Sequence, residues 1–153
     1  REAAQIHQHH VRRLRQAQMQ LVAAPGFADH IRDPDELATL PVLGAAEADR
    51  LVHFRLLGPN GKQQDLALEP RLAIDDFVVR NAAVRAGLGF TALPSMFCEA
   101  ELERGELVNV VPHHRLPVAL YWHCWNLQSD VLDSLSQALR EGAAGALRQV
   151  ASP

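Results

Sequence analysis

Histidine is the first residue type to suggest chemistry in this sequence, because the chain of 153 residues holds eight. Zinc requires three or four ligands that converge in tetrahedral geometry. His7 and His9 would share one face of a strand, but no cysteine or acid stands nearby to complete a ligand set. The further candidates are His10, His113, His114 and His123. The sequence therefore predicts no metal site, and it predicts no cofactor.

The nucleophilic side chains do not form a catalytic pattern. Ser95 lacks the Gly-x-Ser-x-Gly elbow, "GLG" at 87–89 lacks the third glycine of a dinucleotide fingerprint, and no phosphate loop with its lysine occurs. Two cysteines, Cys98 and Cys124, are too few for a disulfide framework. Acids beside Cys98 in "SMFCEAEL" raise a thiol's pKa, which favours a buried, reduced thiol over a redox sensor. The sequence predicts that the chain is not an enzyme.

An acid pair, Asp75 and Asp76, stands where a short apolar strand becomes a helix, in "RLAIDDFVVRNAAVRAGLGFTALPS" (71–95). One of the two can cap the free N–H groups of the first helical turn. Gly87 or Gly89 can take the left-handed conformation that ends the helix before the next strand. In open α/β sheets such strand-to-helix turns line the ligand crevice. This unit therefore predicts a binding edge.

The elements that must position this edge alternate along the chain, and this alternation predicts an α/β fold with crossovers. Strands are expected at 19–24, 41–44, 52–57, 64–68, 71–75, 90–94, 107–111 and 117–125, and helices at 34–39, 76–87, 95–104 and 129–149. Asn60-Gly61 suits a hairpin turn that needs positive φ. Asp33 before Pro34 is a helix N-cap signal.

Composition limits the class of protein. Hydrophobic residues make up 48% and charged residues 22% of the chain, which is ordinary for a globular α/β protein. The net charge of −3 argues against nucleic-acid binding. A basic segment at 7–15 is interpreted as a solvated strand edge in preference to a polyanion site. No apolar stretch approaches the length of a membrane span and no signal segment opens the chain, so we expect a cytoplasmic protein that does not contact a membrane.

Several segments, taken in order, resemble the effector-binding (substrate-binding) domain of LysR-type transcriptional regulators. The more specific ones are "AAVRAGLGFTALP" (82–94), a following "ELERGELVNVVP" (101–112) and the strand "LPVALYWHCW" (116–125). "QLVAAPGF" (20–27) and "DPDELATLPVLG" (33–44) belong to the same ordered set. The resemblance implies a periplasmic-binding-protein-like (type II) lobe with a mixed, mostly parallel sheet flanked by helices.

The resemblance also implies a division of the chain. Residues 1–20 would be a remnant of a first lobe with a hinge crossing, 21–115 the second, effector-binding lobe, and 116–153 a hinge crossing with the returning strand and helix of the first lobe. The winged helix-turn-helix and most of the first lobe would lie outside this chain. DNA would be bound only through that missing domain, and the full-length protein would form dimers or tetramers.

Effector contacts are carried over onto the strand ends. These residues are Ala24, Pro25, Gly44, Ala45, Ala46, Asp75, Asp76, Phe77, Thr91 and Leu93. For Asp76 a helix N-cap is favoured over ligand contact, although the two are compatible, and for Phe77 a core position is favoured over stacking on a ligand. Family effectors are often anionic, and two acids at the helix start oppose an anion. A cationic or neutral effector therefore has equal standing.

The function that the resemblance implies is ligand sensing, in which a small molecule binds between two lobes and controls DNA binding. The alternative is a solute-binding lobe of a non-regulatory binding protein or enzyme subunit, because a fold does not fix a function. A DNA-binding module upstream would favour the regulator, and an export signal there would favour the alternative.

Overall fold

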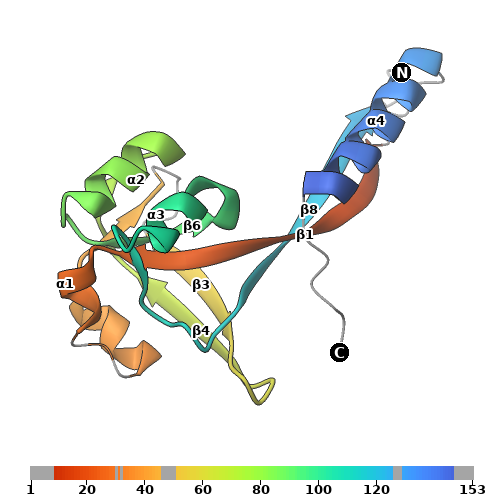
Figure 1. Cartoon of the computed structure of the whole chain (residues 1–153). Coiled ribbons are helices and arrows are strands. Elements are labelled where there is room, and N and C mark those ends of the chain that lie inside the picture. The colour runs from red at the N-terminus through yellow and green to blue at the C-terminus, as the bar shows by residue number, and fades with distance from the viewer. Residues whose placement is uncertain (1–8, 30, 32, 46–50, 126–128, 147–153) are drawn as a thin grey trace, which may run out of the picture. The chain divides into compact units, whose positions relative to one another are not determined.

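Residues 9–29, 31, 33–45, 51–125 and 129–146 are described by a computed structural model of the chain (Figure 1). The chain divides into two units, which are described separately. The larger unit comprises residues 18–117, and the smaller unit comprises residues 1–17 together with 118–153. Two strands, β1 (His9–Ala23) and β8 (Leu116–Trp125), have residues in both units.

The larger unit is built on a mixed sheet in the order β5-β2-β6-β1-β7. Its other strands are β2 (Val42–Gly44), β5 (Pro70–Ala73), β6 (Phe90–Pro94) and β7 (Val108–Asn109). β2 runs parallel to its two neighbours, β5 and β6, whereas β1 runs antiparallel to β6 and β7. This arrangement confirms the α/β fold with a mixed sheet that the sequence predicts.

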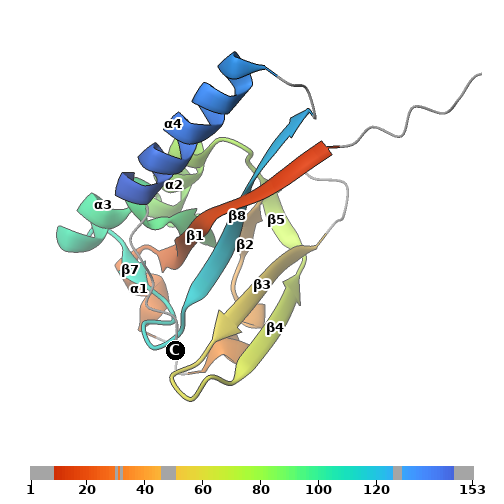
Figure 2. The same ribbon diagram turned by 90° about the vertical axis from the view of Figure 1, so that its right-hand side faces the viewer.

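A separate hairpin joins β3 (Val52–Leu57) to β4 (Gln63–Leu68), as the Asn60-Gly61 pair predicts (Figure 2). Gly61 has a φ of 70°, in the left-handed region that a residue with a Cβ avoids. An exposed ion pair between Arg55 and Asp65 joins the two strands at 2.9 Å. The hairpin is anchored by paired backbone hydrogen bonds between Leu57 and Arg115.

The helices of the larger unit are short. They are α1 (Pro25–Ala28), the 3₁₀ helix η1 (Pro34–Thr39), α2 (Phe77–Arg85), the 3₁₀ helix η2 (Ser95–Phe97) and α3 (Glu99–Glu103). Asp33 and Glu36 form a capping box at the start of η1, which confirms the helix predicted at 34–39. The single helix predicted at 95–104 is instead η2 followed by α3, with Cys98 between them at ψ 0°.

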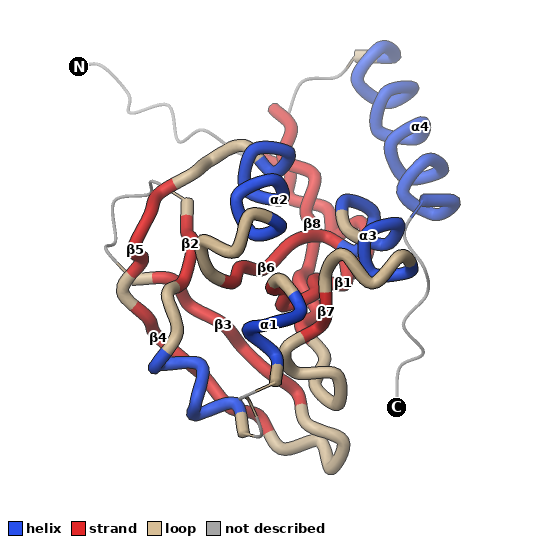
Figure 3. Tube along the Cα trace, turned by 60° about the vertical axis from the view of Figure 1, so that its left-hand side comes forward, coloured by secondary structure: helices blue, strands red, loops and turns tan. Residues whose placement is uncertain are grey.

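Side chains on the two faces of the sheet form two hydrophobic clusters, because successive residues of a strand point to opposite faces. Leu21 and Ala23 pack with Phe54 and Leu56 of the hairpin. Val22 packs instead in a second cluster with Val84 of α2, Leu43, Leu93, Cys98 and Leu107. The hairpin and η1 therefore cover one face, and α2 and α3 cover the other (Figure 3).

The smaller unit holds the first part of β1, which pairs with β8, and helix α4 (Asp130–Ala146). Trp122 Nε1 donates to Ser136 Oγ at 3.0 Å, and Arg140 Nε donates to the Ser136 carbonyl at 3.1 Å. Ser136 is buried, and the bond from Trp122 joins β8 to α4, whereas the bond from Arg140 lies within α4. Among the described helices of the chain, none is long and apolar enough to span a membrane.

Candidate functional site

The parallel strands β5, β2 and β6 end at one edge of the sheet, which is called the carboxyl edge. It comprises residues 44–45, 74–77 and 94–97. Gly44 is paired with Ala73, and the Ile74 amide donates to the Gly44 carbonyl at 2.7 Å. The structure therefore brings together Gly44, Ala45, Asp75, Asp76 and Phe77, as the sequence predicts for adjacent parallel strands. Ala46, also predicted, lies outside the described residues.

Asp76 is the N-cap of α2. Its Oδ1 atom accepts hydrogen bonds from the amides of Val78 at 2.8 Å and Val79 at 2.9 Å. The favoured interpretation of Asp76 as a cap is confirmed. Because these amides are the donors that an anionic ligand would use at a helix N-terminus, the protein's own carboxylate already occupies that position.

Arg80 lies one helical turn after Asp76, whose carbonyl accepts its amide, and it is buried, with 7% of its surface exposed. Its Nε donates to the Ile74 carbonyl at 2.7 Å and its Nη2 to the Asp75 carbonyl at 3.3 Å. Burial lowers the pKa of the guanidinium, and the charges of Asp75 and Asp76 partly oppose that shift. Sequence reasoning missed Arg80, although its place four residues after the N-cap puts it one helical turn from the strand end.

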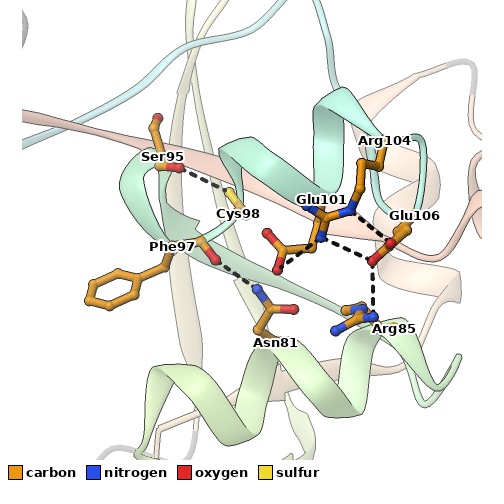
Figure 4. Close-up of polar contacts among 8 residues, drawn as sticks. All are labelled: Asn81, Arg85, Ser95, Phe97, Cys98, Glu101, Arg104 and Glu106. Carbon is orange, nitrogen blue, oxygen red and sulfur yellow. Dashed lines mark hydrogen bonds and ion pairs between the residues drawn. The ribbon is translucent and has the colours of Figure 1, made fainter.

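Two half-exposed aromatic rings stand beside the acids. Phe77 and Phe97 are stacked with centroids 5.4 Å apart, and the Arg80 guanidinium carbon lies 5.2 Å from the Phe77 centroid. Their exposed fractions are 36% and 41%, so Phe77 is not a core residue. Asn81 Nδ2 donates to the Phe97 carbonyl at 2.7 Å, which fixes η2 against α2 (Figure 4).

A polar network that the sequence did not reveal joins β1 to the carboxyl edge. Ser95 Oγ donates to the Gln18 carbonyl at 2.9 Å and accepts a hydrogen bond from Gln20 Nε2 at 3.2 Å. Asn109 Nδ2 donates in turn to Gln20 Oε1. These side chains meet because β1 runs antiparallel to β6, with Met19 opposite Pro94.

Four predicted contact residues are not brought to this edge. Ala24 and Pro25 follow the other end of β1, where Ala23 is paired with Phe90, so the antiparallel direction of β1 carries them to the opposite edge. Thr91 and Leu93 lie within β6 with exposed fractions of 1% and 0%. The Thr91 hydroxyl donates to the Leu43 carbonyl at 2.7 Å, which accounts for a polar residue at that place.

Ion pairs at the far end of α2 fix the helix to α3 (Figure 4). Glu106 contacts Arg85 at 2.9 Å and Arg104 at 2.8 Å, and Arg104 also lies 3.8 Å from Glu101. The hydrogen bond from Arg104 lowers the pKa of Glu106, with smaller attraction from the charges of Arg104 and Arg85. The arginines of these pairs are exposed and the glutamates are partly exposed, so each pair contributes little to stability.

Cys98, His113 and His114 are the candidates of these types whose surroundings the structure describes most fully. Cys98 is fully buried, and burial, then Glu101 and Glu99, raises the pKa of its thiol to about 11. His113 and His114 line a cavity of about 220 Å³ with Asp33. Within the described part of the chain, no group of three or more histidine, cysteine or acidic side chains could hold a metal ion.

Comparison with known proteins identifies helix-turn-helix (HTH-type) transcriptional regulators as relatives. The HTH-type transcriptional regulator ArgP of Photobacterium profundum is 44% identical over 63 residues, which are 41% of this chain and 21% of that protein. The HTH-type transcriptional regulator LysG of Mycobacterium tuberculosis is 39% identical over 67 residues, 44% of this chain and 22% of that protein. The matched part is thus about a fifth of either relative.

Solved structures share the fold. Full-length LysG from Corynebacterium glutamicum with bound effector Arg has a TM-score of 0.69 and 24% identity, covering 97% of this chain and 50% of that one. The regulatory domain of the AphB variant C227S from Vibrio vulnificus has a TM-score of 0.68 and 17% identity, covering 93% and 72%. Residues 1–144 match the family model described as LysR substrate binding domain, so this chain belongs to the LysR substrate-binding domain family.

Proposed function

We propose that the chain is the effector-sensing part of a transcriptional regulator, and that a small-molecule effector binds at the carboxyl edge. Family membership and the helix-turn-helix regulators among the relatives support this proposal. The observation that carries it is an exposed Asp75 beside a helix N-terminus that Asp76 already caps.

The proposed effector is a basic amino acid of the arginine or lysine type. A carboxylate at a partly exposed site attracts a guanidinium or ammonium group. An anionic effector would meet the charge of Asp75 and would find the Val78 and Val79 amides in use. The solved LysG structure with Arg as its effector supports the same class. The exposed rings of Phe77 and Phe97 would pack against the apolar part of such a ligand.

Sensing would work by a shift of population, so the effector must bind two arrangements of the protein with different affinity. β1 and β8 have residues in both units and would be the hinge connections that respond. DNA would be bound by a helix-turn-helix domain outside this chain. The full-length regulator would form dimers or tetramers and would act in the cytoplasm. We assign no catalytic step to the chain, because the Ser95 hydroxyl is hydrogen-bonded and the Cys98 thiol is buried.

Calorimetric titration of the full chain with L-arginine, L-lysine and L-glutamate tests the proposal. We expect binding of the two basic amino acids and none of glutamate. Asp75→Asn should weaken arginine binding about tenfold, whereas Asp29→Asn, which removes an equal charge from an exposed site at the end of α1, should not. Tighter binding of glutamate, or equal effects of the two substitutions, would overturn it.

A further inference from the structure

Arg80 is the one charged side chain that is buried in the part of the chain that the structure describes. Removing a charge from water is costly unless nearby dipoles or opposite charges compensate. Here the compensation comes from two backbone carbonyls and from the neighbouring acids. A leucine or methionine could fill the same volume without that cost, so the charge itself requires an explanation.

The guanidinium fixes the turn that carries the acids. Its two hydrogen bonds reach consecutive carbonyls, those of Ile74 and Asp75, and thereby hold the strand end in one conformation. A planar guanidinium can make this forked contact, whereas an ammonium group offers a single point of charge. The ring of Phe77 lies 5.2 Å from the same group. Arg80 therefore fixes the backbone positions from which the side chains of residues 75 to 77 project.

The same guanidinium also sets the charge of the edge. Asp75 and Asp76 carry two negative charges, and the positive charge of the buried Arg80 offsets one of them. The hydrogen bonds from the Val78 and Val79 amides stabilise the negative charge of Asp76 at the start of α2. The edge is thus left with about the single negative charge that complements the side chain of a basic amino acid.

We infer that Arg80 is a positioning residue that sets the charge selectivity of the carboxyl edge for its effector. This inference rests on the proposed function and adds a residue to it. Arg80 does not contact the ligand, because it is buried. It acts on the ligand through the geometry and the net charge of the acid pair.

The test compares L-arginine with L-citrulline, in which a neutral urea group replaces the guanidinium. Calorimetric titration of the full chain gives the ratio of the two dissociation constants. In Arg80→Gln, which keeps a donor for one carbonyl but removes the charge, the preference for arginine over citrulline should increase roughly fivefold. In Arg80→Lys, which keeps the charge but not the fork, both ligands should bind more weakly while their ratio stays within about twofold.

Arg85→Gln is the matched control. It removes an equal charge from the same helix, at an exposed position paired with Glu106. Screening at physiological salt should leave the ligand ratio unchanged there. Circular dichroism and urea unfolding of each variant establish that it folds.

The outcomes separate this inference from the proposed function. If the unaltered chain binds neither amino acid, the proposed effector class is wrong. If it binds arginine and the ratio in Arg80→Gln equals that of the unaltered chain, Arg80 is only a structural brace and the inference is overturned. If Arg80→Gln does not fold, Arg80→Lys decides, since unchanged affinity for both ligands would contradict the positioning role and equal weakening would support it.

Discussion

The two edges of the sheet in the larger unit differ in what their residues leave exposed. The carboxyl edge presents Asp75 and the stacked rings of Phe77 and Phe97 over a buried Arg80. The opposite edge, called the amino edge, comprises residues 24–25, 41 and 89. There a Cβ added to Gly89 would overlap the carbonyl oxygen of Pro41.

The two edges are therefore expected to differ in which property of the protein their residues determine, its stability or its ligand affinity. At the amino edge the backbone of Gly89 approaches that of Pro41 so closely that no side chain fits at position 89. At the carboxyl edge buried groups orient exposed ones. Substitutions at the amino edge should therefore change the free energy of unfolding, and substitutions at the carboxyl edge should change ligand affinity.

Gly89→Ala should have the largest effect on stability. Gly89 has a φ of 157°, and the added Cβ would collide with backbone atoms of Pro41. We expect a loss of roughly 3 kcal/mol in the free energy of unfolding, measured by urea denaturation. Gly26→Ala is the control, because nothing lies within 4 Å of the added methyl group there, and it should cost less than about 0.5 kcal/mol. Equal effects would mean that the close approach of Gly89 to Pro41 does not contribute to stability.

Thr91→Val should have the next largest effect, because it leaves the buried carbonyl of Leu43 without its donor. We expect a loss of about 2 kcal/mol in the free energy of unfolding and no change in arginine affinity. Thr91→Ser keeps the hydroxyl and should retain most of the hydrogen bond. Weaker arginine binding by a folded Thr91→Val variant would instead support the sequence-based prediction that Thr91 contacts the effector.

The local patterns were the ones that could be predicted from sequence. Asp33 and Asp76 precede helices because a short acid can accept the first free amides, and both are observed as caps. Gly61 marks a hairpin turn for an equally local reason. Each of these inferences needs only residues close together in the chain.

The direction of β1 could not be predicted in this way. Whether Ala24 or Gln18 lies at the carboxyl edge depends on β1 running antiparallel to β6, a pairing of residues about 70 positions apart. The burial of Arg80 similarly depends on the carbonyls of the preceding strand. The acids of the candidate site were therefore found from sequence, whereas the network of Gln20, Ser95 and Asn109 was not.

Asp76→Ala should have a smaller effect on stability, because it removes the N-cap of α2. The loss of two hydrogen bonds to Val78 and Val79 should cost about 1 kcal/mol in urea denaturation. Asp76→Asn keeps a capping oxygen and should unfold like the unaltered chain, yet it should bind arginine more weakly because it removes a charge. If Asp76→Asn retains full arginine affinity, Asp76 is a cap alone and Asp75 carries the electrostatic attraction.

The smallest expected effect is the reaction of the Cys98 thiol with an external reagent. Cys98 directly follows the exposed residues of the carboxyl edge, yet it is fully buried. In Cys124→Ser, where Cys98 is the remaining thiol, we expect negligible reaction with a disulfide reagent at about pH 8 and full reaction in urea. Burial raises the pKa of this thiol from 9.0 to about 11, so the unfolded chain loses the proton first and stability should fall as the pH rises from 9 towards 11. Rapid reaction of the folded variant would mean that the carboxyl edge opens beneath η2, and the contrast between an exposed surface and a closed interior would then not hold.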